Sequence, residues 1–96
     1  MIQLIWSDEA SQDLDGIYEY IARTSSYYAQ RTIERILHRG KQIAAFPQSG
    51  TTVPEYQNPR IRQVVEGQYR LIYHIEPDKI TVLTVVHGAR NILRDE

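Results

Sequence analysis

The sequence predicts a two-layer α+β domain, in which an N-terminal strand and a helical hairpin pack on an antiparallel-dominated sheet that ends in a three-stranded meander. Three runs rich in β-branched and aromatic residues indicate the meander, at positions 61–65, 69–75 and 80–86. The dipeptides Glu66-Gly67 and Pro77-Asp78 separate these runs at hairpin spacing. Two stretches with helical periodicity precede the runs, and we expect them to cover one face of the sheet.

A short strand and a first helix are predicted at the start of the chain. The large apolar residues Ile2, Leu4 and Trp6 occupy alternate positions, which indicates a strand. Ser7 is a favourable N-cap, and two acids follow in the first turn, where the helix dipole stabilises negative charge. We therefore expect a helix over residues 8–23. Its apolar stripe consists of Ala10, Leu14, Ile17, Tyr18, Ile21 and Ala22.

A second helix is predicted after the connection at residues 24–26. Its apolar residues recur at helical spacing as far as Phe46, and Pro47 ends the helix because the residue before a proline disfavours the helical conformation. Gly40 costs this helix about 1 kcal/mol relative to alanine, which a close crossing with the first helix or the sheet would explain. Residues 48–59 form a long loop, and long ordered loops often carry function. The periodic residues are Ala29, Ile33, Ile36, Leu37, Gly40, Ile43 and Ala44.

The register of the second hairpin predicts which side chains share a face of the sheet. A four-residue loop at 76–79 sends four cross-strand pairs to the more apolar face, which we expect to pack on the helices. The opposite face is expected to be open to solvent or to a partner. On that face Arg70 and His87 become diagonal neighbours, and Arg90 follows the end of the strand. The four pairs are Ile75 with Ile80, Tyr73 with Val82, Leu71 with Thr84, and Tyr69 with Val86.

Size and composition bound the class of protein. The 96 residues suffice for one domain, residues 1–96, and the formal charge of −1 gives no general attraction to nucleic acid or to membranes. The sequence has no cysteine and no run near the roughly 18 apolar residues that a membrane helix needs. The N-terminus does not resemble a signal peptide, so we expect a cytoplasmic protein.

Charge is distributed unevenly along the predicted hairpin. The asymmetry predicts either an acidic patch beside a basic one or, as the simpler interpretation, charge pairing between two adjacent helices. Residues 1–22 hold the acids Asp8, Glu9, Asp13, Asp15 and Glu19 and no base, and residues 23–41 hold the bases Arg23, Arg31, Arg35, Arg39 and Lys41 against Glu34 alone.

The residue types exclude several kinds of chemistry. The glycines do not cluster into a nucleotide-binding loop, and the three histidines are scattered without carboxylates at ligand spacing. We therefore expect no cofactor and no metal. What remains is a set of cations and hydrogen-bond donors. This set, the candidate target-binding residues, is Arg60, Arg62, Arg70, His87 and Arg90.

Two interpretations of these cations stay open. Arginine forks bind phosphates or carboxylates, and a metal-independent ribonuclease needs groups that transfer protons together with cations that stabilise the developing charge. Glu55 or His87 could transfer the protons, and Arg62, Arg70 or Arg90 could stabilise the charge. Alternatively, the arginines pair with Glu66, Glu76 or the carboxylates of a partner protein.

Several segments, taken together and in order, resemble the ParE branch of the RelE/ParE toxin superfamily. They are WSDEASQDLDGIYEYI, a second helix ending in FP, SGTTVPE, IRQVV followed by YRLIYHI, and ITVLTVVHGAR. The match covers nearly the whole chain, and YRLIYHI followed by VVHGAR is its most specific part. The resemblance implies the α+β fold described above, and a small plasmid-stabilisation toxin that is made with a cognate antitoxin.

The resemblance leaves three functions open. ParE-like toxins poison DNA gyrase by stalling the cleaved-DNA complex, whereas RelE-like toxins cut messenger RNA in the ribosomal A site, commonly with a C-terminal tyrosine or a Glu/His pair. No tyrosine follows His87, which favours a gyrase toxin whose surface determinants include Arg62, Arg70, His87 and Arg90. Glu55 keeps RNA cleavage open if it faces His87. The third function is that of an inactive relative that binds only its antitoxin.

The second helix carries a candidate antitoxin-binding row. Arg31, Arg35 and Arg39 recur at every fourth residue, and the resemblance implies that an antitoxin docks beside the helices. An acidic antitoxin segment would fit this row, and a solvated helix face is the alternative. No oligomeric state follows from the sequence.

Overall fold

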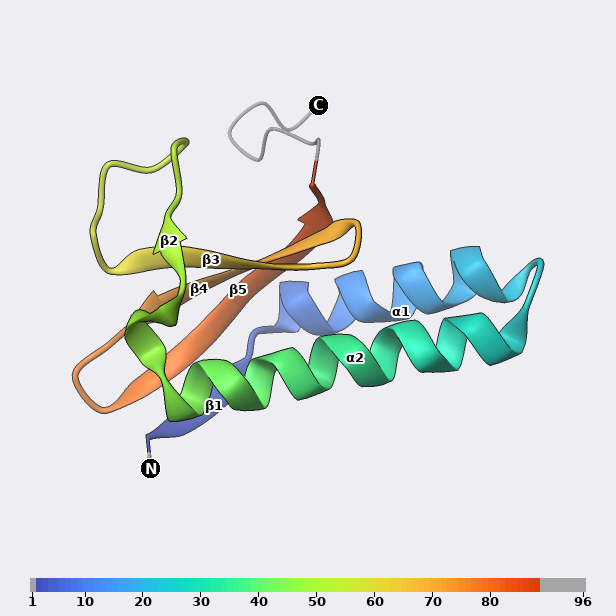
Figure 1. Cartoon of the computed structure of the whole chain (residues 1–96), viewed down its shortest axis with the longest axis horizontal. Helices are drawn as coiled ribbons and strands as arrows, with labels where there is room; N and C mark the ends of the chain where they lie inside the picture. Colours follow the sequence, from blue (N-terminus) through green and yellow to red (C-terminus); the bar gives the residue numbers. More distant parts are fainter. Residues whose placement is uncertain (1, 89–96) are drawn as a thin grey trace.

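The computed structural model describes residues 2–88, in which a helical hairpin covers one face of a five-stranded sheet (Figure 1). The strand order is β1-β5-β4-β3-β2, with β1 parallel to β5 and all other neighbours antiparallel. This arrangement confirms the predicted α+β fold. No helix among residues 2–88 combines the length and the apolar character needed to cross a membrane. The elements are β1 (Gln3–Trp6), α1 (Asp8–Ala22), α2 (Ser26–Ala45), the 3-10 helix η1 (Pro47–Ser49), β2 (Thr51–Thr52), β3 (Ile61–Glu66), β4 (Tyr69–Ile75) and β5 (Lys79–His87).

Both long helices begin and end close to their predicted positions because local signals fix their ends. Ser7 caps α1, and its hydroxyl oxygen accepts a 3.0 Å hydrogen bond from the backbone N–H of Ala10. Ser25 caps α2 in the same way by accepting from the backbone N–H of Tyr28 at 3.1 Å. Pro47 begins η1 directly after the end of α2, as the restriction on the residue before a proline predicts.

Gly40 marks a place where α2 lies close to the sheet. A Cβ atom at this position would lie 2.6 Å from the Trp6 ring and 3.1 Å from the Leu4 side chain. Both residues belong to β1, so the expected close crossing is confirmed, and it is made with the N-terminal strand. A larger residue at position 40 would push the helix and the strand apart.

The main core lies between the helical hairpin and the sheet. Its fully buried members come from both helices and from the two central strands. Burying one side chain of this size stabilises the fold by about 1.5–3 kcal/mol, so this layer dominates the packing energy. The largest buried members of this core are Ile36, Ile43, Leu71, Tyr73, Ile80 and Val82.

A β-bulge in β5 changes the predicted register halfway along the second hairpin. Ile75 pairs with Ile80 and Tyr73 with Val82, as predicted. The next residue of β4 pairs with Thr84, so Leu83 is an extra residue in β5, and the predicted partners of Leu71 and Tyr69 are wrong. The pairs beyond the bulge are Ile72 with Thr84, Leu71 with Val85, Arg70 with Val86, and Tyr69 with His87.

The bulge places Arg70 and His87 on opposite faces of the sheet. Residues that pair across antiparallel strands point to the same face, so His87 accompanies Tyr69 on the helix side and Arg70 accompanies Val86 on the other side. The prediction that Arg70 and His87 share a face is therefore wrong. It failed because one extra residue reverses the alternation of every side chain that follows it.

The face opposite the helices is partly covered by the chain itself. Val53 and Tyr56, from the loop between β2 and β3, join a second apolar cluster with Ile72 and Val86 on the sheet. Val53 is only 1% exposed, so the loop is anchored at this point. The expectation that this face is open therefore needs correction around Arg70.

Candidate functional site

Arg70 lies under the loop, where Glu55 and Gln63 accept side-chain hydrogen bonds from it. Its Nη2 contacts Oε2 of Glu55 at 2.9 Å, and its Nη1 contacts Oε1 of Glu55 at 3.2 Å and Oε1 of Gln63 at 2.8 Å. The two contacts with Glu55 form a bidentate ion pair, the stronger geometry for an arginine and a carboxylate. Arg70 is only 8% exposed, so this pair is shielded from water.

The short turn after Val53 brings Glu55 over the sheet. The backbone N–H of Tyr56 donates to the carbonyl of Val53 at 3.0 Å, which closes the turn, while both apolar side chains pack on the sheet face below. Glu55 stands between these two anchors. Its position opposite Arg70 therefore depends on apolar packing as well as on charge.

A second set of contacts ties the start of the loop to the sheet. The Tyr73 hydroxyl donates to the carbonyl of Pro47 at 2.7 Å and accepts from the N–H of Gly50 at 3.0 Å, and Arg62 Nη1 donates to the carbonyl of Gly50 at 2.7 Å. A Cβ at position 50 would collide with that hydroxyl and lie 2.6 Å from the carbonyl oxygen of Gln63. Burial raises the pKa of Tyr73 above its ordinary value, although its hydrogen bond with Gly50 and the nearby Arg62 lower it. The buried Nε of Arg62 has no hydrogen-bond acceptor within the described residues.

Among the predicted target-binding residues that the structure describes, Arg60 and His87 are exposed. Arg60 precedes β3, and its backbone accepts a 2.8 Å hydrogen bond from the N–H of Ile75. The His87 ring lies edge-on to Tyr69, with ring centroids 6.1 Å apart. Arg90 lies outside the described residues. The four predicted residues that the structure describes therefore do not form one exposed patch.

The contacts of Glu55 and His87 test whether these two residues could act as a proton-transfer pair, as the sequence analysis left open. Both carboxylate oxygens of Glu55 accept hydrogen bonds from Arg70, which stabilises the charged carboxylate. His87 belongs to the face on which Tyr69 lies, opposite Arg70. Both oxygens of Glu55 are thus engaged by Arg70, on the face of the sheet opposite the one that carries His87. Among residues 2–88, no group of three or more histidine, cysteine, aspartate or glutamate side chains is placed to hold a metal ion.

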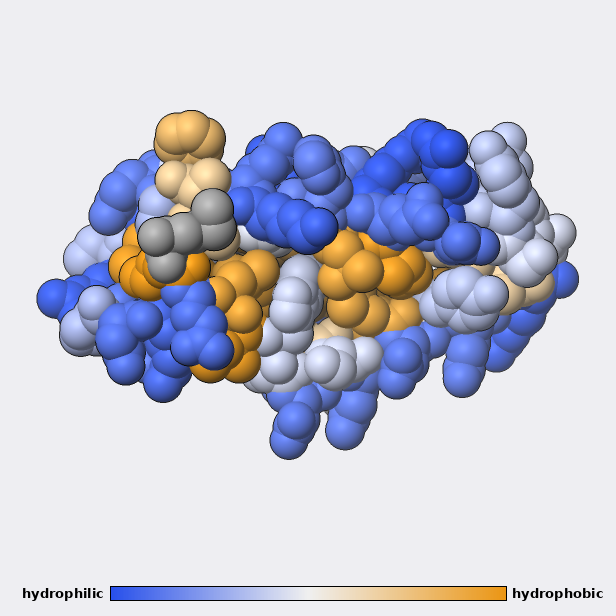
Figure 2. Space-filling model, turned by 90° about the horizontal axis from the view of Figure 1, so that it is seen from below, coloured by the Kyte–Doolittle hydropathy of each residue, from blue (hydrophilic) through white to orange (hydrophobic). Residues whose placement is uncertain are grey.

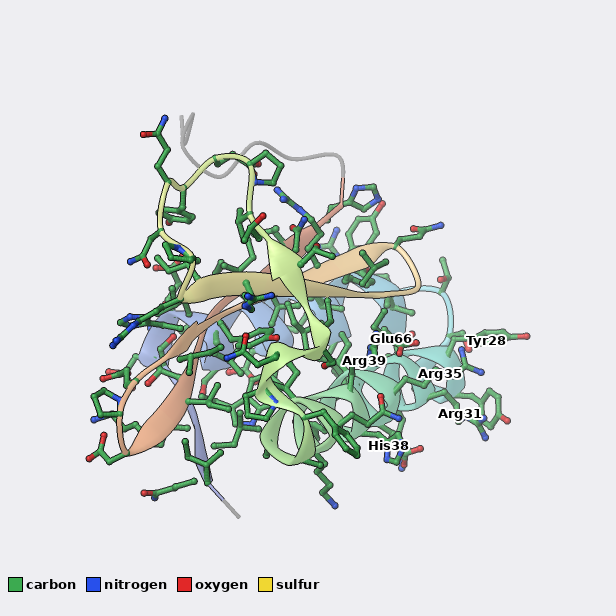
Figure 3. The ribbon with its side chains drawn as sticks, turned by 60° about the vertical axis from the view of Figure 1, so that its left-hand side comes forward. Tyr28, Arg31, Arg35, His38, Arg39 and Glu66 are labelled. Carbon is green, nitrogen blue, oxygen red and sulfur yellow. The ribbon has the colours of Figure 1, made fainter. Side chains whose placement is uncertain are left out.

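The outer flank of α2 is the more accessible cationic surface. Figure 3 shows Tyr28, Arg31, Arg35, His38 and Arg39 along this helix, with Glu66 of β3 nearby. Arg31 and Arg35 are exposed, whereas Arg39 donates to the backbone oxygen of Val65 at 3.4 Å and to Gln42 at 2.8 Å.

The predicted charge pairing between the two helices is wrong. None of the ion pairs found among residues 2–88 joins α1 to α2. The acids of α1 and the bases of α2 therefore remain as separate charged surfaces. Figure 2 shows the molecule from the hairpin side, where an apolar band runs between two hydrophilic rows.

Two hollows flank α1 where the sheet ends, and the sequence did not indicate either of them. One, of about 250 Å³, lies under the β3–β4 turn and involves Arg35 and Glu66. The other, of about 450 Å³, lies between α1 and the end of β5 and involves Gly16 and His87. Tyr20 and Tyr69 line both hollows, so they form adjoining recesses. No sequence signal could reveal them, because they arise where helix and sheet diverge.

With this geometry in place, sequence comparison shows the family. The family model for the ParE toxin of the type II toxin-antitoxin system parDE matches residues 4–92. The chain therefore belongs to the ParE toxin family and is a toxin of the type II toxin-antitoxin class. One relative, Toxin RelE2 of Caulobacter vibrioides, is 28% identical over 91 residues, which cover 94% of this chain and 99% of that protein.

Solved structures of similar fold also come from toxin-antitoxin systems. The chromosomal ParDE system from P. aeruginosa matches with a TM-score of 0.74 at 21% identity, over 91% of this chain and 96% of that chain. The RelBE2 toxin-antitoxin complex from Mycobacterium tuberculosis matches with a TM-score of 0.65 at 17% identity, over 90% and 96% of the two chains. At these identities the likeness shows the fold alone.

Proposed function

We propose that this toxin arrests growth by poisoning DNA gyrase through protein contact, and that a cognate antitoxin neutralises it. The observation that carries the proposal is the Arg70–Glu55 ion pair. RNA cleavage would need the guanidinium of Arg70 to be accessible to a phosphate, yet Arg70 engages Glu55 at 2.9 Å and both side chains are largely buried. A phosphate group could reach the guanidinium of Arg70 only if the loop moved away. The match to the ParE family model also favours this proposal.

A ribosome-dependent endoribonuclease is the second candidate function. The exposed His87 and the name of the relative Toxin RelE2 favour it. In such an enzyme His87 or Glu55 would transfer protons, and Arg62 and Arg70 would hold the scissile phosphate. This function requires the loop to release Glu55 and Arg70 when messenger RNA binds, whereas gyrase binding does not.

In our proposal the predicted target-binding residues have two different roles. Arg60 and His87 are exposed and would contact the target directly. Arg62 and Arg70 would act as positioning residues, because they hold the loop that lies over the sheet. Arg90, beyond the described residues, stays a predicted contact.

We also propose that the antitoxin docks on the outer flank of α2. Arg31 and Arg35 are exposed, and no α1 carboxylate within the described residues pairs with them, so they are available to an acidic segment. Arg39 is partly committed to Val65 and Gln42 and would contribute less. Complementary charges of this kind mainly raise the association rate, so the contact should weaken as salt is added.

Two measurements on the same protein separate the two candidate functions. Purified toxin is incubated with gyrase and supercoiled plasmid, and protein-linked DNA breaks are counted after denaturation. In parallel, RNA 5′ ends are mapped after induction in cells. Breaks that increase with toxin and no new RNA ends would support gyrase poisoning. Codon-positioned RNA ends that vanish in His87→Ala would replace it with RNA cleavage.

A further inference from the structure

The tip of the helical hairpin carries an aromatic and cationic cluster that the proposed function has not used. We define the hairpin tip as Tyr20, Arg23, Tyr27, Tyr28 and Arg31. The three tyrosines are 70%, 63% and 65% exposed, in that order. Large aromatic side chains are rarely this exposed in groups unless they contact a partner. Figure 1 shows the hairpin projecting beyond the sheet, and Figure 3 shows Tyr28 and Arg31 at its outer end.

Hydrogen bonds tie the connection between α1 and α2 to the last turn of α1. The backbone N–H groups of Thr24 and Ser25 both donate to the carbonyl of Ile21 at 3.0 Å, and the Thr24 hydroxyl donates to the same oxygen at 3.1 Å. Ser25 also caps α2. Side chains on such a turn lose little additional backbone entropy when they bind, which is a property of preorganised interfaces.

The side chains of the tip are organised by contacts among themselves. The Arg23 guanidinium lies 5.9 Å from the centre of the Tyr20 ring, and the Arg31 guanidinium lies 6.0 Å from the centre of the Tyr27 ring. Tyr27 and Tyr28 meet edge to face at 5.5 Å. Tyrosine and arginine are the residue types that most often carry the binding energy of protein interfaces.

The charge of the tip indicates the chemistry of its partner. Residues 20–33 contain Arg23 and Arg31 and no acid. The end of α1 and the start of α2 meet at this turn, so their opposite dipole ends largely cancel and the two arginines set the local charge. An acidic surface would therefore be complementary. Single-stranded nucleic acid fits less well, because base stacking needs free ring faces and these rings are already covered in part by guanidinium groups and by each other.

We propose that the hairpin tip docks on an acidic surface of the protein that the toxin arrests. This inference rests on the proposed function, since it assumes that a target protein is bound. It follows from the contrast in accessibility: on the sheet face Arg70 is buried under its own loop, whereas the tip offers exposed tyrosines and arginines on a hydrogen-bonded turn. Arg31 also belongs to the proposed antitoxin row, so it is left unchanged in the test below.

The test compares growth arrest and target binding for Tyr27→Ala/Tyr28→Ala, for Arg23→Ala and for Phe46→Ala. Phe46 is the matched control, because it is 69% exposed but follows the opposite end of α2. Each variant is induced in cells that lack the antitoxin, and its affinity for purified gyrase is measured by biolayer interferometry. Urea unfolding of each variant confirms that the fold is intact.

We expect the double tyrosine variant to bind gyrase about 30-fold more weakly, the loss typical of interface hot spots, and to arrest growth less. Arg23→Ala should weaken binding by about 10-fold, and Phe46→Ala should match the wild type. If the tip variants unfold at lower urea than Phe46→Ala, Tyr28→Phe replaces the double variant and should still lower the affinity.

The remaining outcomes each decide a different point. Tip variants that arrest growth as strongly as the wild type would overturn the inference. Wild-type toxin that arrests growth without binding gyrase would refute the gyrase target, and a loss of arrest in the tip variants would then still support docking of the tip on another target. A fluorescein-labelled 20-nucleotide single strand that binds wild-type toxin but not the tip variants would assign the tip to nucleic acid and overturn the inference.

Discussion

The sheet face around Arg70 and the flank of α2 around Arg35 carry the same type of side chain in opposite circumstances. Arg70 is 8% exposed and its fork is engaged by Glu55 and Gln63, whereas Arg35 is exposed on the surface of the helix. The same residue type therefore holds a loop in one region and remains accessible to solvent in the other. What decides between the two roles is whether the chain itself supplies the acceptor.

The energetic consequences differ as much as the geometry. Removing one partner from a buried ion pair leaves an uncompensated charge and destabilises the fold by several kcal/mol. An exposed arginine loses little when it is replaced, because water already solvates its charge. Substitutions in the two regions therefore test the comparison directly, through stability in one and through binding in the other.

The largest effect is expected for Arg70→Ala. The side chain of Glu55 is only 14% exposed, so its charge would lose its partner in a poorly solvated place. The free energy of unfolding should fall by about 3 kcal/mol, measured by urea denaturation at neutral pH. Arg35→Ala is the control and should change it by less than about 0.5 kcal/mol. Equal losses in the two variants would break the comparison.

A smaller loss of stability is expected for Tyr73→Phe, which tests the contacts that tie the start of the loop to the sheet. The substitution removes the hydroxyl that donates to Pro47 and accepts from Gly50, and it leaves both backbone groups without that partner. The free energy of unfolding should fall by about 2 kcal/mol. Tyr18→Phe, at an exposed position on α1, should be close to neutral. A neutral Tyr73→Phe would mean that the loop is held without this hydroxyl.

Alkaline pH should also lower the free energy of unfolding, because it ionises the Tyr73 hydroxyl. Burial raises the pKa of Tyr73 in the folded state, so the neutral phenol stabilises the fold in full below the unfolded tyrosine value of about 10. This stabilisation is lost as the pH rises from that value through the folded pKa. Stability measured in steps from pH 8 to pH 11 should fall more steeply for the wild type than for Tyr73→Phe. Parallel curves would contradict the role of burial.

The smallest effect on stability, and a clear effect on binding, is expected for Arg31→Glu/Arg35→Glu. The free energy of unfolding should stay within about 0.5 kcal/mol of the wild type. Association with the antitoxin should slow by about tenfold at low salt, and the difference should shrink at high salt. Lys41→Glu reverses a charge on the same helix outside the row, and it serves as the control. An unchanged association rate would remove the proposed antitoxin contact.

The sequence determined most of the fold because each element carries its own local signals. Ser7 sets the start of α1 through hydrogen bonding, and Pro47 sets the end of α2 through backbone sterics. The β-branched and aromatic residues at 69–75, with turn residues on both sides, predicted a strand there. Gly40 even indicated a close crossing, which β1 makes. The helix ends and the strand positions depend on neighbours in the chain, so the sequence displays them directly, whereas Gly40 indicated a close contact but not which element would make it.

The arrangement of the candidate site was decided only in three dimensions. The bulge at Leu83 is a single residue without a distinctive signal, yet it moved His87 away from the face of Arg70. The ion pair with Glu55 joins residues 15 positions apart through a loop whose path depends on Val53 packing. Local sequence therefore determined which segments are helices and strands, whereas burial and long-range register decided which charges remain exposed. The physical reason is that a charged side chain pairs with the group nearest to it in space. The alternation of residues along a strand does not specify which group that is.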